Sequence, residues 1–185
     1  MLLLLVVGLG HGATAWSDKY DDTLQVFQQA GASGQLFDNS HGYALFPSIG
    51  KGGIGIGAAR GKGKVYVAGQ HVGNTTMTQV TIGLQLGGQA YSMIIFFEDE
   101  RAYTEFSSGN FEFGAQATAV AITAAASAGT STAGGGTAGA SGGKNDATTA
   151  GGYTKGMAIF TVVKGGMMYE ASLGGQKYKF TPVGG

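Results

Sequence analysis

TQVTIGLQLGGQAYSMIIFF, residues Thr78–Phe97, is the stretch that decides the class of fold. In its first half apolar residues alternate with polar residues and glycine, so Val80, Ile82 and Leu84 share one face of a strand. Its second half, Tyr91–Phe97, is almost continuously apolar, which is typical of a strand buried on both faces. Glycine on the outward face of the first half predicts that another backbone approaches closely or that the sheet bends sharply.

Two helices and several more strands are expected around this stretch. Residues 17–30 predict a helix with Ser17 as its N-cap and with aspartates near the positive end of its dipole. Residues 98–106 predict a short helix with an acidic first turn. Runs of β-forming residues predict further strands at 43–46, 54–58, 65–68, 111–123, 157–163, 167–173 and 177–182. The expected fold class is α+β, with a mainly antiparallel, strongly curved sheet that is barrel-like or a sandwich.

The chain of 185 residues has the length of a single domain. Its start, MLLLLVVGLGHGATAWS, contains a short apolar run followed by the cleavage pattern Ala13-Thr14-Ala15. This pattern predicts a signal peptide at residues 1–15 and a periplasmic or secreted mature chain, although no Lys or Arg precedes the apolar run. A buried N-terminal strand is the alternative. Residues 16–185 then form one domain, in which the glycine-rich tract at about 129–152 is expected to be a loop.

The charges are unevenly distributed although the formal net charge is zero. No carboxylate occurs between Asn39 and Phe97, whereas four cations do. These cations are Lys51, Arg60, Lys62 and Lys64. On glycine-flanked turns they could reach the head groups of an anionic phospholipid, each contact contributing about 1 kcal/mol. The alternative, which the residues alone favour, is a solubilising strand edge where lysines prevent further strand pairing.

The motifs that suggest catalysis or a cofactor are incomplete. Residues 57–62 are one residue short of a P-loop, lack its metal-binding hydroxyl and precede a strand. Ser141 lies in a match to the nucleophile elbow, but within the glycine-rich tract and not at a strand-to-helix turn. His41 and His71 lack partners at metal-ligand spacing. No enzyme, cofactor or metal site is therefore expected, and a hydrolase using Ser141 is kept as a rival hypothesis.

Four blocks of the sequence resemble the SYLF-domain family, a lipid-binding domain also found in yeast and animal SH3 proteins of the actin patch. They are GYALFPSIGKGGIGIGAARGKGKVY, TQVTIGLQLGGQAYSMIIFF, FSSGNFEFGAQATAVAITAAASA and FTVVKGGMMYEASLGGQKYKFTP. The resemblance runs from about Gly42 to Pro182, and the signal peptide suggests an exported, bacterial type. It implies binding of phosphoinositide or another anionic phospholipid and, in the yeast members, of actin. It implies no catalytic residues.

The function expected from these observations is that of a non-enzymatic peripheral protein that binds anionic phospholipid and no nucleic acid. Lys51, Arg60, Lys62 and Lys64 are the expected head-group contacts. The helix at 17–30 corresponds to one that engages membrane in eukaryotic relatives, but its aspartates should repel anionic lipid. The alternatives are an envelope or cytoskeletal, actin-type protein-interaction module and an oligomer assembled through the low-charge strands.

Overall fold

The computed structural model describes residues 14–113, 120–122, 152–164 and 175–184. These residues form three helices and one six-stranded sheet. The elements are α1 (Thr14–Gln29), α2 (Gly31–Gly34), β1 (Gly42–Val67), β2 (Gln70–Phe97), α3 (Glu100–Ser107), β3 (Phe111–Glu112), β4 (Val120–Ile122), β5 (Met157–Lys164) and β6 (Lys177–Pro182). The described strands pair antiparallel except β4 with β5. The predicted α+β class with a curved, mainly antiparallel sheet is confirmed.

A long antiparallel ribbon of β1 and β2 forms the frame of the sheet. Its pairing runs from Gly42 opposite Phe97 to Val67 opposite Gln70. On its other edge β2 pairs with β6 through residues 73–78 and with β5 through residues 90–97. The prediction of separate short strands at 43–46, 54–58 and 65–68 is wrong, because all three belong to β1. Glycine interrupts the run of β-forming side chains, but its backbone still pairs with β2.

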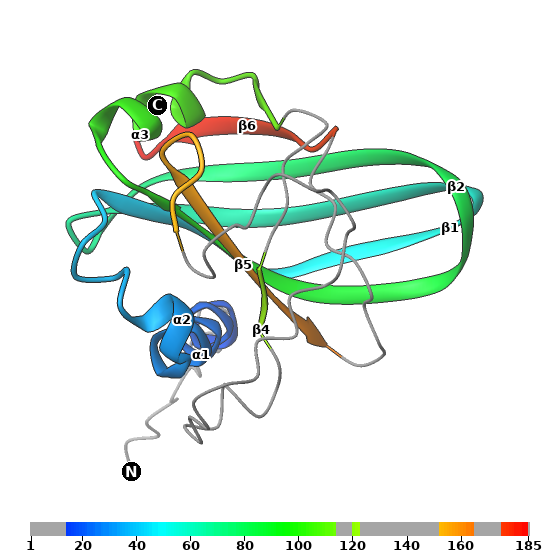
Figure 1. Cartoon of the computed structure of the whole chain (residues 1–185), viewed down its shortest axis with the longest axis horizontal. Coiled ribbons are helices and arrows are strands. Elements are labelled where there is room, and N and C mark those ends of the chain that lie inside the picture. Colours follow the sequence, from blue (N-terminus) through cyan, green and yellow to red (C-terminus); the bar gives the residue numbers. More distant parts are fainter. Residues whose placement is uncertain (1–13, 114–119, 123–151, 165–174, 185) are drawn as a thin grey trace, which may run out of the picture.

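The ribbon turns back on itself, so that the two halves of β1 approach each other (Figure 1). A Cβ atom added to Gly63 would lie 2.8 Å from the carbonyl oxygen of Leu45 and 2.8 Å from the ring of Phe46. Gly53, with a φ of 155°, and a shift of register between Ile54 and Ile56 mark the bend. A close approach of backbones is thus found between the halves of β1, at a glycine other than those of β2 for which it is predicted. This bent end is the far right of the ribbon in Figure 1.

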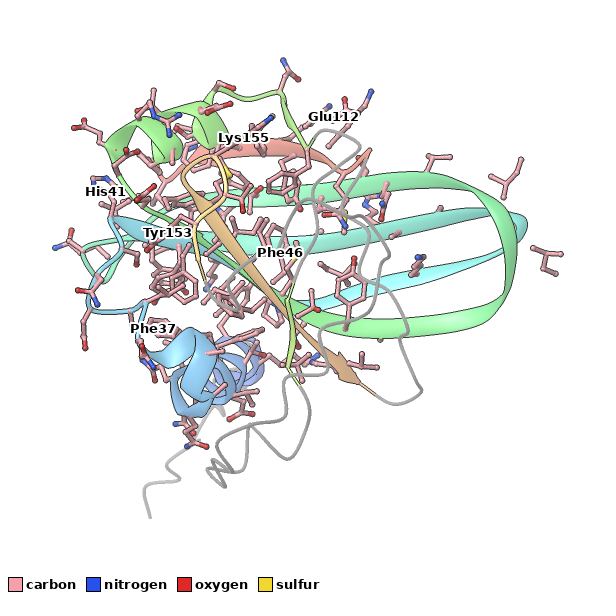
Figure 2. All side chains as sticks on the ribbon, in the orientation of Figure 1. Phe37, His41, Phe46, Glu112, Tyr153 and Lys155 are labelled. Atoms are coloured by element: carbon pink, nitrogen blue, oxygen red, sulfur yellow. The ribbon has the colours of Figure 1, made fainter. Side chains whose placement is uncertain are left out.

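Two apolar clusters lie on opposite sides of the ribbon. The first lies between the two halves of β1 and is completed by α3; it includes Ala44, Phe46, Ile49, Ala59, Val65, Met77, Tyr91, Met93, Ile95, Phe97, Phe106 and Tyr178. The second lies beneath α1 and α2 and includes Tyr20, Phe27, Ala30, Leu45, Ile94, Phe96 and Phe160. In Figure 2, Phe46 lies in the middle of the molecule and Phe37 lies beside α2. All residues from Tyr91 to Phe97 are buried, as the continuous apolar run predicts.

The helix boundaries differ from those expected. α1 begins at Thr14, so Ser17 is not its N-cap and its first turn contains no acidic residue. Thr14 to Trp16 contain no helix breaker, and the helix therefore extends past the expected cap. The predicted short helix is confirmed as α3, where the Asp99 side chain accepts a hydrogen bond from the backbone N–H of Ala102 at 2.8 Å. The predicted loop at 129–152, except its last residue, the strand at 167–173 and Ser141 lie outside the described residues.

A buried polar cluster joins β2 to the start of β6. The side-chain amide of Gln176 donates to Gln79 Oε1 at 3.3 Å and to the Tyr91 hydroxyl at 3.4 Å, and the Tyr178 hydroxyl donates to Gln176 Oε1. Burial raises the pKa of Tyr91 to about 12, and the hydrogen bond with Gln176 opposes this rise. Burial also raises the pKa of Tyr178, as does the neighbouring Tyr91. Both phenols are therefore held neutral in the folded protein.

The close approach at Gly63 predicts that Gly63→Ala destabilises the fold. The added methyl group must displace Leu45 or Phe46, and such overpacking costs about 1–3 kcal/mol of unfolding free energy. Urea denaturation measures this loss. Gly50→Ala, in the same strand with no atom within 4 Å of the added Cβ, is the matched control and should leave stability within about 0.5 kcal/mol. Equal losses in the two variants would contradict the close approach.

The raised pKa of Tyr91 predicts a loss of stability in alkali. Its folded-state pKa of about 12 lies above the value of 10.0 expected in the unfolded chain. The stabilisation is therefore complete below pH 10 and is lost as the pH rises towards 12, at about 1.4 kcal/mol per pH unit. Tyr91→Phe should make the fall of unfolding free energy between these pH values shallower, as measured by urea denaturation. An unchanged slope would show that Tyr91 is not buried.

Candidate functional site: a basic face on β1, β2 and β6

Strand alternation places three of the predicted cations on one face of β1. Arg60 and Lys62 are exposed and Lys64 is half-buried, whereas the residues between and beside them, Ala59, Gly61, Gly63 and Val65, are buried. Successive cations on one face are about 6.6 Å apart along the strand. These side chains lie within a paired strand and not on turns, so the expectation of glycine-flanked turns is wrong.

Lys51 does not join these three residues. It follows the buried Ile49 by two positions, so alternation places it on the opposite face of the ribbon. It lies just before the bend, opposite Gln89, and is half-buried. The structure therefore brings together Arg60, Lys62 and Lys64 but not Lys51.

The register of β6 adds two further cations to the same face. Thr78 lies opposite Arg60 on one side and Lys177 on the other, and Thr76 lies between Lys62 and Lys179 in the same way. Residues directly opposite in a sheet share a face. With strands about 4.8 Å apart, each lysine of β6 lies about 10 Å from its counterpart on β1. We call Arg60, Lys62, Lys177 and Lys179 the basic face.

Sequence reasoning missed Lys177 and Lys179 because the pairing of β6 with β2 joins segments about a hundred residues apart. A partial signal was present. The two lysines flank the apolar Tyr178, which is fully buried in the structure, so alternation alone predicts that they share the outward face. Which residues lie beside them on the neighbouring strand could not be read from that pattern.

The positive charge of the basic face is largely unopposed. Among the described residues, Arg60, Lys62 and Lys179 form no ion pair, and each is exposed. Lys177 Nζ lies 3.6 Å from Glu112 Oε2 on β3, in a pair exposed to solvent. Exposed pairs of this kind contribute little to stability, so Lys177 can exchange this partner for another anion at small cost.

Lys64 borders the basic face and contacts α1. Its Nζ lies 4.5 Å from the ring centroid of Tyr20, which is a cation–π distance. Burial raises the pKa of the neighbouring Tyr66 to about 12, with smaller contributions from Tyr43, Tyr20 and Asp21. The acidic helix α1 therefore lies at this border, and Lys64 helps to hold it against the sheet.

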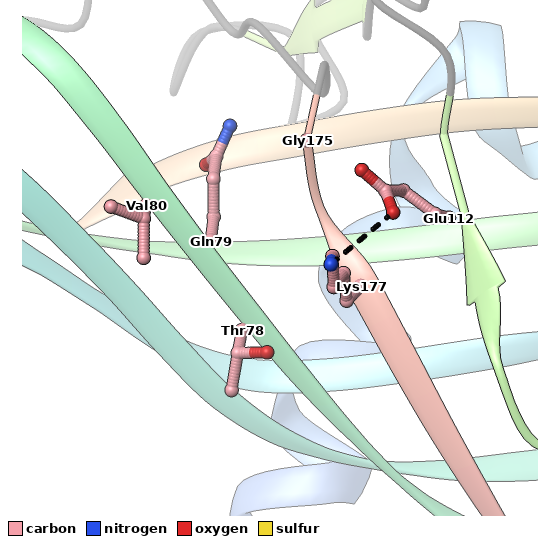
Figure 3. A pocket seen from close by; sticks show the side chains of 6 residues that line it. All are labelled: Thr78, Gln79, Val80, Glu112, Gly175 and Lys177. Atoms are coloured by element: carbon pink, nitrogen blue, oxygen red, sulfur yellow. Dashed lines mark ion pairs between the residues drawn. The ribbon is translucent and has the colours of Figure 1, made fainter.

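A hollow of about 340 Å³ opens beside the basic face (Figure 3). It is lined by Thr78, Gln79, Val80, Glu112, Gly175 and Lys177. Its cation and its carboxylate are paired with each other, and its lining contains no histidine, cysteine or serine. Within the described residues, no three histidine or acidic side chains are grouped as metal ligands. The hollow thus offers neither a nucleophile with a base nor a set of metal ligands.

Comparison with known proteins identifies the family. The profile of the Ysc84 family, described as Las17-binding protein actin regulator, matches residues 78–180. The chain belongs to this family. The SYLF resemblance of the sequence is thereby confirmed. The matched range includes Lys177 and Lys179 but begins after Arg60 and Lys62, so it says nothing about those two residues.

One curated relative is beta cell expansion factor A of Aeromonas veronii, 27% identical over 157 residues. The match covers 84% of this chain and 51% of that protein, so the chain spans about half the length of the curated relative it matches. None of the described helices combines the length and the apolar character needed to cross a bilayer.

The contact between Lys64 and Tyr20 predicts a structural role that Lys62 does not share. Lys64→Met keeps the apolar stem but removes the ammonium group, and should lower the unfolding free energy by about 0.5–1 kcal/mol. Lys62→Met, one position along the same face, should change stability by less than about 0.5 kcal/mol. Urea denaturation of both variants provides the measurement. A larger loss in the Lys62 variant would contradict this division of roles.

Proposed function

We propose that this chain is a non-enzymatic peripheral protein that binds anionic phospholipid through the basic face. The observation that carries the proposal is the group of exposed cations on one face, three of which have no ion-pair partner among the described residues. The carboxylate-free segment from Asn39 to Phe97 supports it, because β1 and β2 carry no negative side chain that would repel a phosphate. Membership of the Ysc84 (SYLF) family is compatible with a lipid-binding or a protein-binding module.

The chemistry of the face suits a layer of phosphates more than a single bound molecule. The four cations are spread over β1 and β6, about 7–10 Å apart, with Thr76 and Thr78 between them as neutral hydrogen-bond donors. The guanidinium group of Arg60 can donate two parallel hydrogen bonds to one phosphate, whereas each lysine acts as a point charge. Binding of this kind is additive and sensitive to salt.

Protein binding is the second candidate, and the family description favours it. The family profile is described as an actin regulator and Las17-binding protein, which makes an actin-type or envelope protein partner the rival ligand. Co-sedimentation with filamentous actin and with phospholipid vesicles separates the two. Saturable binding to a protein partner without vesicle binding would favour the rival.

We further propose that the chain is exported, as the apolar run and the Ala13-Thr14-Ala15 pattern predict. Cleavage after Ala15 would leave α1 nearly complete from Trp16 onward, with its contacts through Tyr20 and Phe27 retained. N-terminal mass spectrometry of protein recovered from a periplasmic fraction should then find Trp16 as the first residue. Recovery of the uncleaved chain from the cytoplasm would contradict export.

The role of the basic face predicts that Arg60→Ala/Lys62→Ala weakens binding to vesicles containing phosphatidylglycerol or cardiolipin. Loss of two contacts of about 1 kcal/mol each corresponds to about 30-fold weaker binding at low salt. Vesicle co-sedimentation at low and high salt measures it, with phosphatidylcholine vesicles as the neutral reference.

Arg101→Ala/Lys155→Ala is the control for charge, because it also removes one exposed guanidinium and one exposed ammonium group, although Arg101 is paired with Asp99 and Glu105 whereas Arg60 is in no ion pair among the described residues. Both of its residues lie outside the basic face, and this variant should bind within about threefold of the unmodified chain if two surface charges act only through weak long-range attraction. Equal weakening in the two double variants would remove the basic face from the mechanism.

A further inference from the structure

The bent end of the ribbon exposes large apolar side chains next to the basic face. Ile54 is 85% exposed, Ile56 65% and Val80 70%. Ile54 and Ile56 lie on β1, and Val80 lies on β2. Val80 pairs with Ala58, which is two positions from Ile56 on β1. Together they form what we call the apolar tip.

Ile56 and Val80 of the apolar tip occupy the same side of the ribbon as the basic face, and Ile54 lies beyond the register shift at the bend. Ile56 and Arg60 occupy even-numbered positions of β1 and alternate with the buried Gly57 and Ala59. On β2, Val80 follows Thr78, which lies between Arg60 and Lys177. The basic face and the apolar side chains therefore form one continuous surface. At 3.3 Å per residue, Ile56 lies about 13 Å from Arg60 along the strand.

The positive charges beside the apolar tip indicate that its binding partner is an anionic bilayer. Arg60 and Lys62 lie on β1 beside the tip, on the same face as Ile56 and Val80, whereas Lys51 points to the opposite face. No carboxylate occurs on either strand of the ribbon. An apolar end bordered by cations matches the boundary between acyl chains and phosphates, where side chains enter about 5–10 Å deep.

We propose that the apolar tip inserts Ile54, Ile56 and Val80 into the acyl boundary of an anionic membrane while Arg60 and Lys62 remain at the phosphates. The inference rests on the proposed function and deepens it. The tip is a two-stranded ribbon, because β6 and β5 pair with β2 only at residues 73–78 and 90–97, and its outer backbone edges have no strand partner among the described residues. Only the side chains therefore enter the acyl boundary, while the backbone edges stay at the level of head groups and water, where they can form hydrogen bonds.

The first test separates insertion from charge attraction by its salt dependence. Ile54→Ser/Ile56→Ser should bind phosphatidylglycerol vesicles about tenfold or more weakly at high salt, because the salt-resistant, apolar part of the binding is lost. Val183→Ser, which removes another exposed apolar side chain outside the tip, should bind as the unmodified chain does. Unchanged high-salt binding of the double variant would overturn the insertion.

The second test reports the depth of the tip directly. The chain has one tryptophan, so Trp16→Phe provides a background in which Ile56→Trp is the only indole. Its fluorescence should be quenched by vesicles with brominated acyl chains, whereas that of Thr104→Trp on the exposed side of α3 should not. Vesicle binding without quenching at position 56 would overturn the insertion and leave the proposed function standing.

Two other outcomes are distinguishable from these. Failure of the unmodified chain to bind vesicles at low salt would overturn the proposed function together with the insertion. The lipid-free chain could instead associate with itself, which would appear as sedimentation that depends on protein concentration. If Ile54→Ser/Ile56→Ser abolishes this association and position 56 shows no quenching, the apolar tip is a contact between two copies of the chain, and its insertion is overturned.

Discussion

The structure depends on the close approach between the two halves of β1. A two-stranded ribbon alone leaves the apolar side chains of its faces exposed to water, and an isolated hairpin is at best marginally stable. By turning back at Gly53, the ribbon places Phe46 and Ile49 from one half against Gly61, Gly63 and Val65 from the other, and it buries both sets in a common core. Glycine at positions such as Gly63 makes this possible, because a larger residue would separate the backbones.

The same bend determines the surface. With one face of β1 enclosed, alternation forces Arg60 and Lys62 outward, and pairing with β2 and β6 brings Lys177 and Lys179 beside them. The bend itself cannot be enclosed, because it is the end of the ribbon. Its isoleucines are left exposed next to the cations. The bend that encloses the core thus also produces a surface that is basic over the sheet and apolar at the end of the ribbon.

Much of this could be predicted from local pattern. Alternation and apolar runs identified the strands of β2, β5 and β6, the acidic start of α3 and the curved sheet, because each of these depends on residues close in sequence. The continuity of β1 was missed, because glycine weakens the strand signal although its backbone still pairs. The N-terminal boundary of α1 was missed because Ser17, a favourable cap, is also tolerated inside a helix.

The candidate site was predictable only in part. Arg60 and Lys62 were identified because the lack of carboxylates between Asn39 and Phe97 is a property of the sequence itself. The separation of Lys51 from them follows from alternation along β1, which could be applied only once the expected glycine-flanked turns proved to be one continuous strand. The contribution of β6 depends on long-range register, which no local pattern encodes.

The measurement that tests the account most directly is the mapping of amide chemical shifts of the folded chain by NMR, on titration with a short-chain phosphatidylglycerol. Lipid binding through the basic face and the apolar tip predicts that the largest changes fall on residues 54–64 of β1, 74–80 of β2 and 177–179 of β6, and that phosphatidylcholine of the same chain length produces much smaller ones. Changes centred instead on α3 and the start of β5, with the basic face unaffected, would contradict it.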